Sequence, residues 1–184
     1  MNKAVFIDKD GTLIEDIPYN VDPGVVEFTV GAVDALKKLK RSGYLLILVS
    51  NQSGIAHGYF DEAALENMKL KLQEKLKLSN IELDAFYFCP HHPMGKIPKY
   101  AIVCECRKPK SGMILDAAKN HNIDLSRSWM IGDILNDVEA GNAAGCRTIL
   151  IDNGNETEWL ASAKRTPTAT APDLGVAAEK IIHH

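Results

Sequence analysis

Asp8 and Asp10 are aspartates one residue apart, and they directly follow the apolar residues 4–7 and precede Gly11. The apolar run predicts a buried strand, in which side chains two residues apart lie on the same face. The two carboxylates should therefore emerge side by side, where they repel each other unless a cation offsets their charge. Hard oxygen ligands of this kind suit Mg²⁺. A strand followed by an ordinary Asp-Gly turn explains the same residues, and the pair alone does not decide between a metal site and a turn.

The elements that must position these carboxylates follow from hydrophobic periodicity. Apolar runs predict further strands at residues 44–50, 83–88, 129–131 and 148–151. Amphipathic or capped segments predict helices at residues 31–42, 61–78, 111–120, 136–144, 156–163 and 174–182. Strands that alternate with helices indicate an α/β fold, with a doubly wound, mostly parallel sheet covered by helices on both faces.

Length, charge and composition bound the class of protein. The chain has 184 residues and a net charge of −3, so one domain over residues 1–182 is expected, with no electrostatic case for binding nucleic acid or an anionic membrane. The apolar runs are too short to span a bilayer, and the N-terminal residues lead into a strand rather than a signal peptide. We therefore expect a cytoplasmic monomer, and we interpret His183 and His184 as the remnant of a purification tag.

Polar residues that need an explanation fall at the carboxyl ends of the predicted strands or just after them, where a parallel sheet binds its ligands. They are Asp8, Asp10, Ser50, Asn51, Arg107, Lys108, Asp133 and Asp137. Ser50 and the loop amides after it form an anion cradle or an ordinary turn. Lys108 lies near a helix N-terminus, which favours a nearby anion, whereas the alternative is a solvated basic pair. Asp137 also fits as a favourable acid in the first turn of a helix.

Together these groups resemble the haloacid-dehalogenase-like (HAD) phosphatase superfamily. Four motifs match in order within residues 3–152: Asp-x-Asp-Gly-Thr at residues 8–12, the hydroxyl of Ser50, the amine of Lys108, and Gly-Asp-x-x-x-Asp at residues 132–137. The resemblance implies a Rossmann-like sheet and a phosphatase reaction. In that reaction Asp8 attacks phosphorus, and Asp10 acts first as acid and then as base.

The resemblance also implies which residues contact the metal and the phosphoryl group. Mg²⁺ would be held by Asp8, the backbone carbonyl of Asp10, and Asp133. Ser50 and Lys108 would hold phosphoryl oxygens. The expected role of Asp137 is to orient Lys108 or a metal-bound water.

Three cysteines and two histidines form a second group of candidate metal ligands. They are Cys89, His91, His92, Cys104 and Cys106. Three thiols and one histidine fit a closed, tetrahedral, structural Zn²⁺ site, which would stiffen the loop at residues 89–106. A disulfide, disfavoured by the expected compartment, and free thiols are the alternatives. The family resemblance favours His91 over His92 as the ligand, and the fourth cysteine, Cys146, is expected in the core.

The zinc loop narrows the resemblance to zinc-bearing members of the superfamily, which include the D-glycero-D-manno-heptose 1,7-bisphosphate 7-phosphatases and the histidinol-phosphate phosphatases. Residues 51–60, 89–93 and 106–109 resemble the heptose enzymes. This implies a phosphatase that removes the 7-phosphate of heptose 1,7-bisphosphate, with histidinol phosphate or another small sugar phosphate as the alternative substrate. A non-catalytic, zinc-stabilised binding domain on the same fold is a third interpretation, which the intact aspartate pair opposes.

Loops are expected to shape the substrate pocket, because the intervals between the motifs leave no room for a separate cap domain. The candidate substrate-binding residues are Asp16, Tyr19, Asn51, Gln52, Ser53 and Arg107. Two positions depart from the family pattern. Lys9 replaces an arginine and is expected to point away from Asp8 with little effect, while Ile134 replaces a basic residue able to touch substrate. His57 is expected to be solvated.

Overall fold

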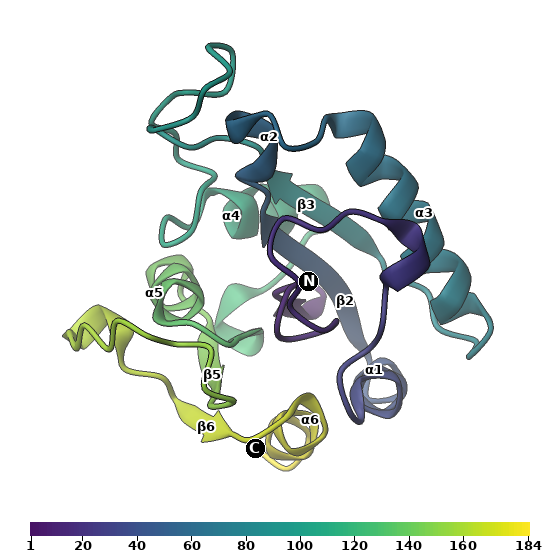
Figure 1. Ribbon diagram of the computed structural model, residues 1–184. Helices are drawn as coiled ribbons and strands as arrows, with labels where there is room; N and C mark the ends of the chain where they lie inside the picture. Colours follow the sequence, from purple (N-terminus) through teal and green to yellow (C-terminus); the bar gives the residue numbers. More distant parts are fainter.

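The computed structural model describes residues 1–184, and its six strands form one parallel sheet (Figure 1). The strands are β1 (Lys3–Ile7), β2 (Tyr44–Asn51), β3 (Ala85–Cys89), β4 (Trp129–Gly132), β5 (Arg147–Ile151) and β6 (Ala169–Ala171). Their order across the sheet is β3-β2-β1-β4-β5-β6, and every neighbouring pair is parallel. All carboxyl ends therefore lie along one edge of the sheet, with β1 between β2 and β4.

Helices cover both faces of the sheet. One layer contains α1 (Ala32–Arg41), α3 (Glu62–Lys77) and α6 (Leu174–Ile182), and the other contains α4 (Gly112–Asn120) and α5 (Leu135–Ala144). Val5 and Ile7 of β1 pack into the first layer, whereas Ala4 and Phe6 pack into the second. Burial of each large apolar side chain stabilises the fold by about 1.5–3 kcal/mol. The continuous apolar run before Asp8 thus results from burial on both faces.

Capping residues set the ends of several helices. Asp61 precedes α3 and Asp173 precedes α6, and the side chain of each accepts a hydrogen bond from the backbone N–H three residues later. Ser111 precedes α4 as predicted, although its side chain makes no capping hydrogen bond. Gly145 ends α5 with φ of 90°, a conformation that glycine adopts without a steric penalty.

The prediction of a helix at residues 156–163 is wrong. Only the 3₁₀ turn η3 (Ala163–Arg165) forms there, and the unpredicted strand β6 follows it. Trp159 has φ of 42°, which a right-handed helix does not contain, and both Trp159 and Leu160 are exposed. The side chain of Glu156 instead accepts a hydrogen bond of 2.6 Å from the first backbone N–H of α5. Tertiary capping therefore replaces helix formation in this segment.

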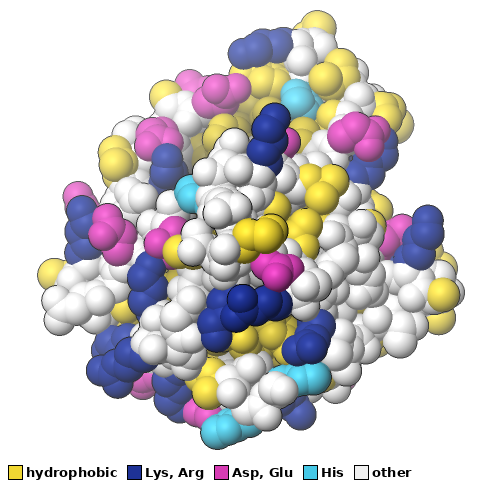
Figure 2. Space-filling view, turned by 180° about the vertical axis from the view of Figure 1, so that it is seen from behind, with side chains coloured by type: hydrophobic (Ala, Val, Ile, Leu, Met, Phe, Trp, Pro, Cys, Tyr) yellow, Lys and Arg dark blue, Asp and Glu magenta, His cyan; other side chains and the backbone are white.

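The surface carries charges of both signs. Figure 2 shows lysine, arginine and acidic side chains interspersed on the face opposite the viewpoint of Figure 1. None of the helices combines the length and the apolar character needed to cross a bilayer. The last helix ends at Ile182, and His184 beyond it packs edge-on against Trp129, with ring centroids 5.3 Å apart.

Candidate active site

Asp8 lies at the carboxyl end of β1, where the site begins. Its backbone N–H donates to the carbonyl of Ile131 in β4 at 2.9 Å, so the strand pairing extends to this residue. Gly11 then turns the chain with φ of 76°, and its N–H donates to the carbonyl of Ile14 at 2.8 Å. A Cβ at Gly11 would lie 2.1 Å from Asp133 Oδ2, so only glycine fits at this turn. Packing at the glycine thus brings Asp133 against the turn that carries the aspartate pair.

Lys108 is the buried cation of the site, with 3% of its side chain exposed. Its Nζ lies 2.5 Å from Asp8 Oδ1 and 2.6 Å from Asp137 Oδ1, and it donates to the carbonyl of Val49 at 2.9 Å. Asn51 fixes the backbone of this lysine, because its side chain donates to the Lys108 carbonyl and accepts from the Lys108 N–H, each at 3.0 Å. The alternative of a solvated basic pair is wrong for Lys108.

Three carboxylates cluster at this lysine's end of the site, and two of them, Asp8 and Asp137, pair with it. Oxygens of Asp8, Asp133 and Asp137 all lie within 4.8 Å of one another, and the three residues are buried. Burial, followed by the charges of Asp8 and Asp137, raises the pKa of Asp133 to about 8, and burial raises the pKa of Asp137 to about 6 against the opposing charge of Lys108. Burial disfavours the charged form of Lys108, but Asp137 and Asp8 outweigh this effect and raise its pKa.

The net charge of the carboxylate cluster indicates which kind of ion could bind there. The three clustered carboxylates, two of which pair with Lys108, leave a net charge of two negatives when all are ionised. A divalent cation matches that charge, and carboxylate oxygens are the ligands that Mg²⁺ prefers. These oxygen ligands therefore fit a hard divalent ion. This favours the interpretation of the sequence around Asp8 as a metal site over its interpretation as an ordinary Asp-Gly turn.

The carboxylate of Asp10 is not part of this group and has its own partners. One of its oxygens pairs with Nζ of Lys9, and the other accepts a hydrogen bond of 3.1 Å from Gln52 Nε2, which also donates to Ser50 Oγ at 2.8 Å. Burial raises the pKa of Asp10, and the neighbouring ammonium of Lys9 opposes that shift. Lys9, expected to point away from Asp8, has a fully buried side chain, and its Nζ pairs with Asp10.

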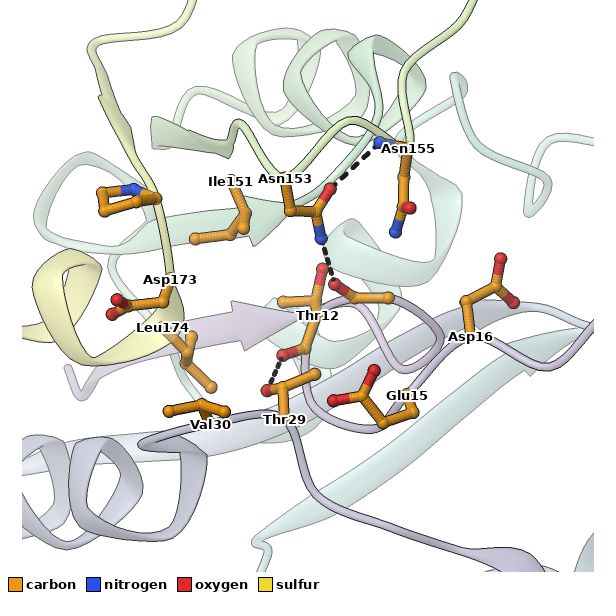
Figure 3. A pocket seen from close by; sticks show the side chains of 12 residues that line it. Thr12, Glu15, Asp16, Thr29, Val30, Ile151, Asn153, Asn155, Asp173 and Leu174 are labelled. Carbon is orange, nitrogen blue, oxygen red and sulfur yellow. Dashed lines mark hydrogen bonds between the residues drawn. The ribbon is translucent and has the colours of Figure 1, made fainter.

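The segment after β5 also reaches the site, which the sequence motifs did not reveal. Asn155 Nδ2 donates to Asp133 Oδ2 at 2.7 Å, and Asn153 Nδ2 donates to the carbonyl of Gly11 at 2.9 Å. The backbone N–H of Asn155 donates to Asn153 Oδ1, which joins the two side chains into one turn (Figure 3). Both asparagines follow a strand of the same parallel sheet, so the rule that ligand sites lie at carboxyl ends of strands was the available signal.

Two cavities adjoin Asp16. One, of about 300 Å³, lies beside Asn153 and Asn155 and does not include Asp8 or Asp10 (Figure 3). The other, of about 280 Å³, opens onto Asp10. Its walls include five of the six residues predicted to bind substrate: Asp16, Tyr19, Asn51, Gln52 and Ser53. We therefore take the second cavity as the candidate substrate pocket.

Two residues considered for contacts with substrate have other neighbours. Arg107 is absent from the pocket lining, and its Nη1 donates to the carbonyl of His91 at 3.3 Å. Ile134 precedes α5, where its backbone N–H donates to Asp137 Oδ2 at 3.3 Å. The side chain of Ile134 carries no charge, so a cationic contact with a distal phosphate has to come from another residue.

An aromatic group borders the substrate pocket. Tyr19 has φ of 56° and packs edge-on against Tyr59, with ring centroids 4.7 Å apart. His57, expected to be solvated, stacks on Tyr59 at 5.7 Å and lies 4.8 Å from the ring of His92. His57 ends the short helix α2 (Gly54–His57), which corrects the prediction of a loop throughout residues 51–60.

Cys89, His91, Cys104 and Cys106 form a second compact group. Cys89 ends β3, and the other three belong to the irregular chain between β3 and α4, part of which projects from the body in Figure 1. Cys106 Sγ lies 2.9 Å from Cys89 Sγ, 3.3 Å from Cys104 Sγ and 3.3 Å from His91 Nδ1. All four cysteines of the chain are free thiols. A zinc tetrahedron with Zn–S bonds of about 2.3 Å needs sulfur–sulfur spacings of about 3.8 Å. The three thiols lie 2.9–3.5 Å apart, so a bound ion would spread them slightly. His92 lies outside this group and accepts a hydrogen bond from a nearby backbone N–H.

Comparisons with known sequences place the chain among phosphatases. Residues 105–177 match the HAD-hydrolase-like family. The chain is 40% identical over 166 residues to the D-glycero-β-D-manno-heptose-1,7-bisphosphate 7-phosphatase of Salmonella typhi, which covers 85% of this chain and 88% of that protein. It is 44% identical over 155 residues to the protein of the same name from Haemophilus influenzae, with 84% of each chain covered.

Solved structures give the same result. A HAD-like phosphatase from Mesorhizobium loti has a TM-score of 0.86 and 31% identity, over 99% of this chain and 87% of that chain. The D,D-heptose 1,7-bisphosphate phosphatase of B. bronchiseptica, complexed with magnesium and phosphate, has a TM-score of 0.80 and 29% identity, over 98% of each chain. The predicted HAD fold without a separate cap domain is confirmed. The chain belongs to the D-glycero-β-D-manno-heptose-1,7-bisphosphate 7-phosphatase family of HAD phosphatases.

Proposed function

We propose that this protein hydrolyses the 7-phosphate of D-glycero-β-D-manno-heptose 1,7-bisphosphate through an aspartyl-phosphate intermediate. The observation that carries the proposal is the pair formed by Asp8 and Lys108, 2.5 Å apart at the end of β1, beside a pocket that opens onto Asp10. The identity of 40% to the Salmonella typhi phosphatase supports the substrate. The single sheet supports one catalytic domain over residues 1–182.

Asp8 is the proposed nucleophile. A carboxylate oxygen of Asp8 forms a bond to phosphorus while the bond from phosphorus to the sugar oxygen breaks. Lys108 and Ser50 would donate to the phosphoryl oxygens as their charge shifts. Asp137, which pairs with Lys108 at 2.6 Å, is proposed to hold that ammonium in place.

Asp10 is the proposed acid and base. It would give a proton to the departing sugar oxygen, and then take a proton from the water that attacks the aspartyl-phosphate. Burial raises the pKa of Asp10, which favours the protonated form that the first step needs. Its position in the lining of the substrate pocket, next to Gln52, supports this assignment.

The carboxylate group fits Mg²⁺, and we propose that Asp8, the backbone carbonyl of Asp10, and Asp133 hold it. When bound, the ion would neutralise the clustered carboxylates and the phosphoryl charge. The magnesium and phosphate in the B. bronchiseptica structure support this proposal.

Asn155→Ala is expected to weaken Mg²⁺ binding about tenfold, because hydrogen-bond partners of metal ligands typically contribute roughly 10- to 100-fold in affinity. Asn155 holds Asp133 Oδ2 at 2.7 Å, and its loss frees that carboxylate to rotate. Calorimetric titration of Mg²⁺ into metal-free protein measures the Kd. Asn120→Ala, which removes a surface amide donor to Tyr87, is the matched control and should leave the Kd unchanged. An unchanged Kd for Asn155→Ala would contradict the prediction.

We propose a structural Zn²⁺ ion held by Cys89, His91, Cys104 and Cys106. The mutual distances of the four ligand atoms support a tetrahedral site. Cys89 ends β3, and Cys106 precedes Lys108 by two residues. The ion would therefore tie the irregular segment to the sheet and fix the stretch of chain that carries Lys108 to Asp8.

Thiol reactivity should report this ion. With zinc bound, the native protein should show no reactive thiol, because three cysteines are ligated and Cys146 is buried, which raises its pKa to about 12. A chelator should release zinc and expose the three ligand thiols, and denaturation should expose all four cysteines. A colorimetric thiol assay and a zinc indicator follow both changes in one sample. Three reactive thiols before chelation would contradict the ligand set.

A steady-state substrate panel tests the proposed substrate. The proposed contacts are the pocket residues Asp16, Tyr19, Asn51, Gln52 and Ser53, together with Arg107, which lies outside the pocket lining and would have to reach the substrate from there. We expect kcat/KM for the β-anomer of heptose bisphosphate to exceed the values for histidinol phosphate and simple sugar phosphates by about 100-fold or more, because hydrogen-bonding pockets discriminate strongly against ligands that leave polar groups unpaired. A hundredfold preference for histidinol phosphate would overturn the substrate assignment and leave the reaction class intact.

A further inference from the structure

Lys9 has an unusual environment for a lysine between two aspartates. Its side chain is fully buried, and its Nζ pairs with Asp10 Oδ1. The other oxygen of Asp10 accepts from Gln52 Nε2, so the carboxylate is held at both ends. A carboxylate fixed at both oxygens has a defined direction, whereas an exposed aspartate samples several rotamers.

The backbone of Lys9 is fixed as well. Its carbonyl accepts hydrogen bonds from the N–H groups of Leu13 and Ile14, each at 3.0 Å, inside the turn that Gly11 makes. Lysine is almost never fully buried unless its charge is paired, and Asp10 is the carboxylate that pairs with it here. The ammonium of Lys9 is therefore held at the carboxylate of Asp10, the acid of the proposed reaction.

We infer that Lys9 is a positioning residue, which holds the carboxyl group of Asp10 in line with the leaving oxygen of the substrate. This inference rests on the proposed function. In the first step the Asp8–phosphorus bond forms, the bond from phosphorus to the leaving oxygen breaks, and the proton of Asp10 moves to that oxygen. A sugar alkoxide is a strong base and needs this proton, whereas nitrophenolate is a weak base and departs without it. Lys9 should therefore matter for sugar phosphates and much less for nitrophenyl phosphate.

The test compares kcat/KM for heptose bisphosphate with kcat/KM for p-nitrophenyl phosphate in Lys9→Met. This quantity reports the barrier from free enzyme and substrate, so the later hydrolysis of the aspartyl-phosphate does not enter it. The ratio of the two values is independent of the folded fraction, so partial unfolding does not mimic the effect. We expect the ratio to fall about tenfold or more, since general acids contribute roughly 10²- to 10⁴-fold.

Two variants complete the experiment. Lys9→Arg keeps the positive charge and should restore most of the ratio. Lys71→Met removes an exposed ammonium that pairs with Glu74, and it should leave both rate constants unchanged. An unchanged ratio in Lys9→Met, including an equal loss on both substrates, would show that Lys9 only supports the fold and would overturn the inference.

Asp10→Asn distinguishes this outcome from a failure of the proposed function. If Asp10→Asn lowers the ratio and Lys9→Met does not, Asp10 is the acid and the inference about Lys9 alone is wrong. If Asp10→Asn also leaves the ratio unchanged, the acid role of Asp10 is wrong, and the inference is overturned together with that part of the proposed function.

Discussion

Asp8→Asn should abolish phosphate release, with a loss in kcat of at least about 10³-fold, as expected when the nucleophile of a concerted catalytic group is removed. An amide oxygen is a poor nucleophile, so the bond from residue 8 to phosphorus does not form. The fold should survive, because Lys108 keeps its second partner, Asp137, at 2.6 Å. Removing one of three clustered carboxylates also relieves repulsion. Phosphate release and thermal denaturation measured on one sample separate lost chemistry from lost structure.

Asp116→Asn is the matched control for this variant. Asp116 is exposed on α4, and the substitution makes the same change of one oxygen to nitrogen. Its activity should equal that of the unchanged protein. Undiminished phosphate release by Asp8→Asn would contradict the assignment of Asp8 as the nucleophile. It would favour the alternative interpretation of the protein as a non-catalytic, zinc-stabilised binding domain.

Lys108→Met should lower the free energy of unfolding by about 3–5 kcal/mol, the usual cost of removing one partner from a buried ion pair. Lys108 has 3% of its side chain exposed and faces Asp8 and Asp137, and the Asp137 side chain is fully buried. Methionine fills the space but leaves both carboxylates without their cation. Urea denaturation in the absence of Mg²⁺ measures the change, because a bound ion would compensate part of the charge.

Two further variants isolate the buried pair as the cause. Lys110→Met removes a lysine two residues later, whose pair with Glu105 is exposed, and it should not change stability measurably. Adding Asp137→Asn to Lys108→Met removes one of the stranded charges and should recover part of the lost stability. If Lys108→Met and Lys110→Met have the same stability, the pairing of Lys108 with its carboxylates does not stabilise the fold.

The sheet and the groups at its strand ends could be predicted from the sequence because both follow from local patterns. A strand covered on both faces requires a continuous apolar run, which Val5, Phe6 and Ile7 supply. Once the strands are placed, parallel topology alone brings Asp8, Ser50 and Asp133 to one edge. The cluster of cysteines could also be predicted, because thiols at such close spacing in the sequence are typical of a metal site.

Contacts made by irregular backbone could not be predicted in this way. The ammonium of Lys9 folds back onto the carboxylate of its neighbour Asp10, and no periodic pattern in the sequence encodes that contact. Asn155 reaches Asp133 through the segment after β5, just before the stretch where a helix was wrongly predicted. In that stretch the dihedral angle of Trp159 and the capping contact of Glu156 override helix propensity.

The phosphate that leaves the substrate gives the most direct test of the proposed function. ³¹P NMR follows the protein acting on D-glycero-β-D-manno-heptose 1,7-bisphosphate in the presence of Mg²⁺. We expect the signal of the 7-phosphate to disappear, inorganic phosphate to appear, and the signal of the 1-phosphate to remain, with no change in the Asp8→Asn protein. Loss of the 1-phosphate, or an unchanged spectrum under conditions in which the same sample hydrolyses histidinol phosphate, would contradict the proposed reaction.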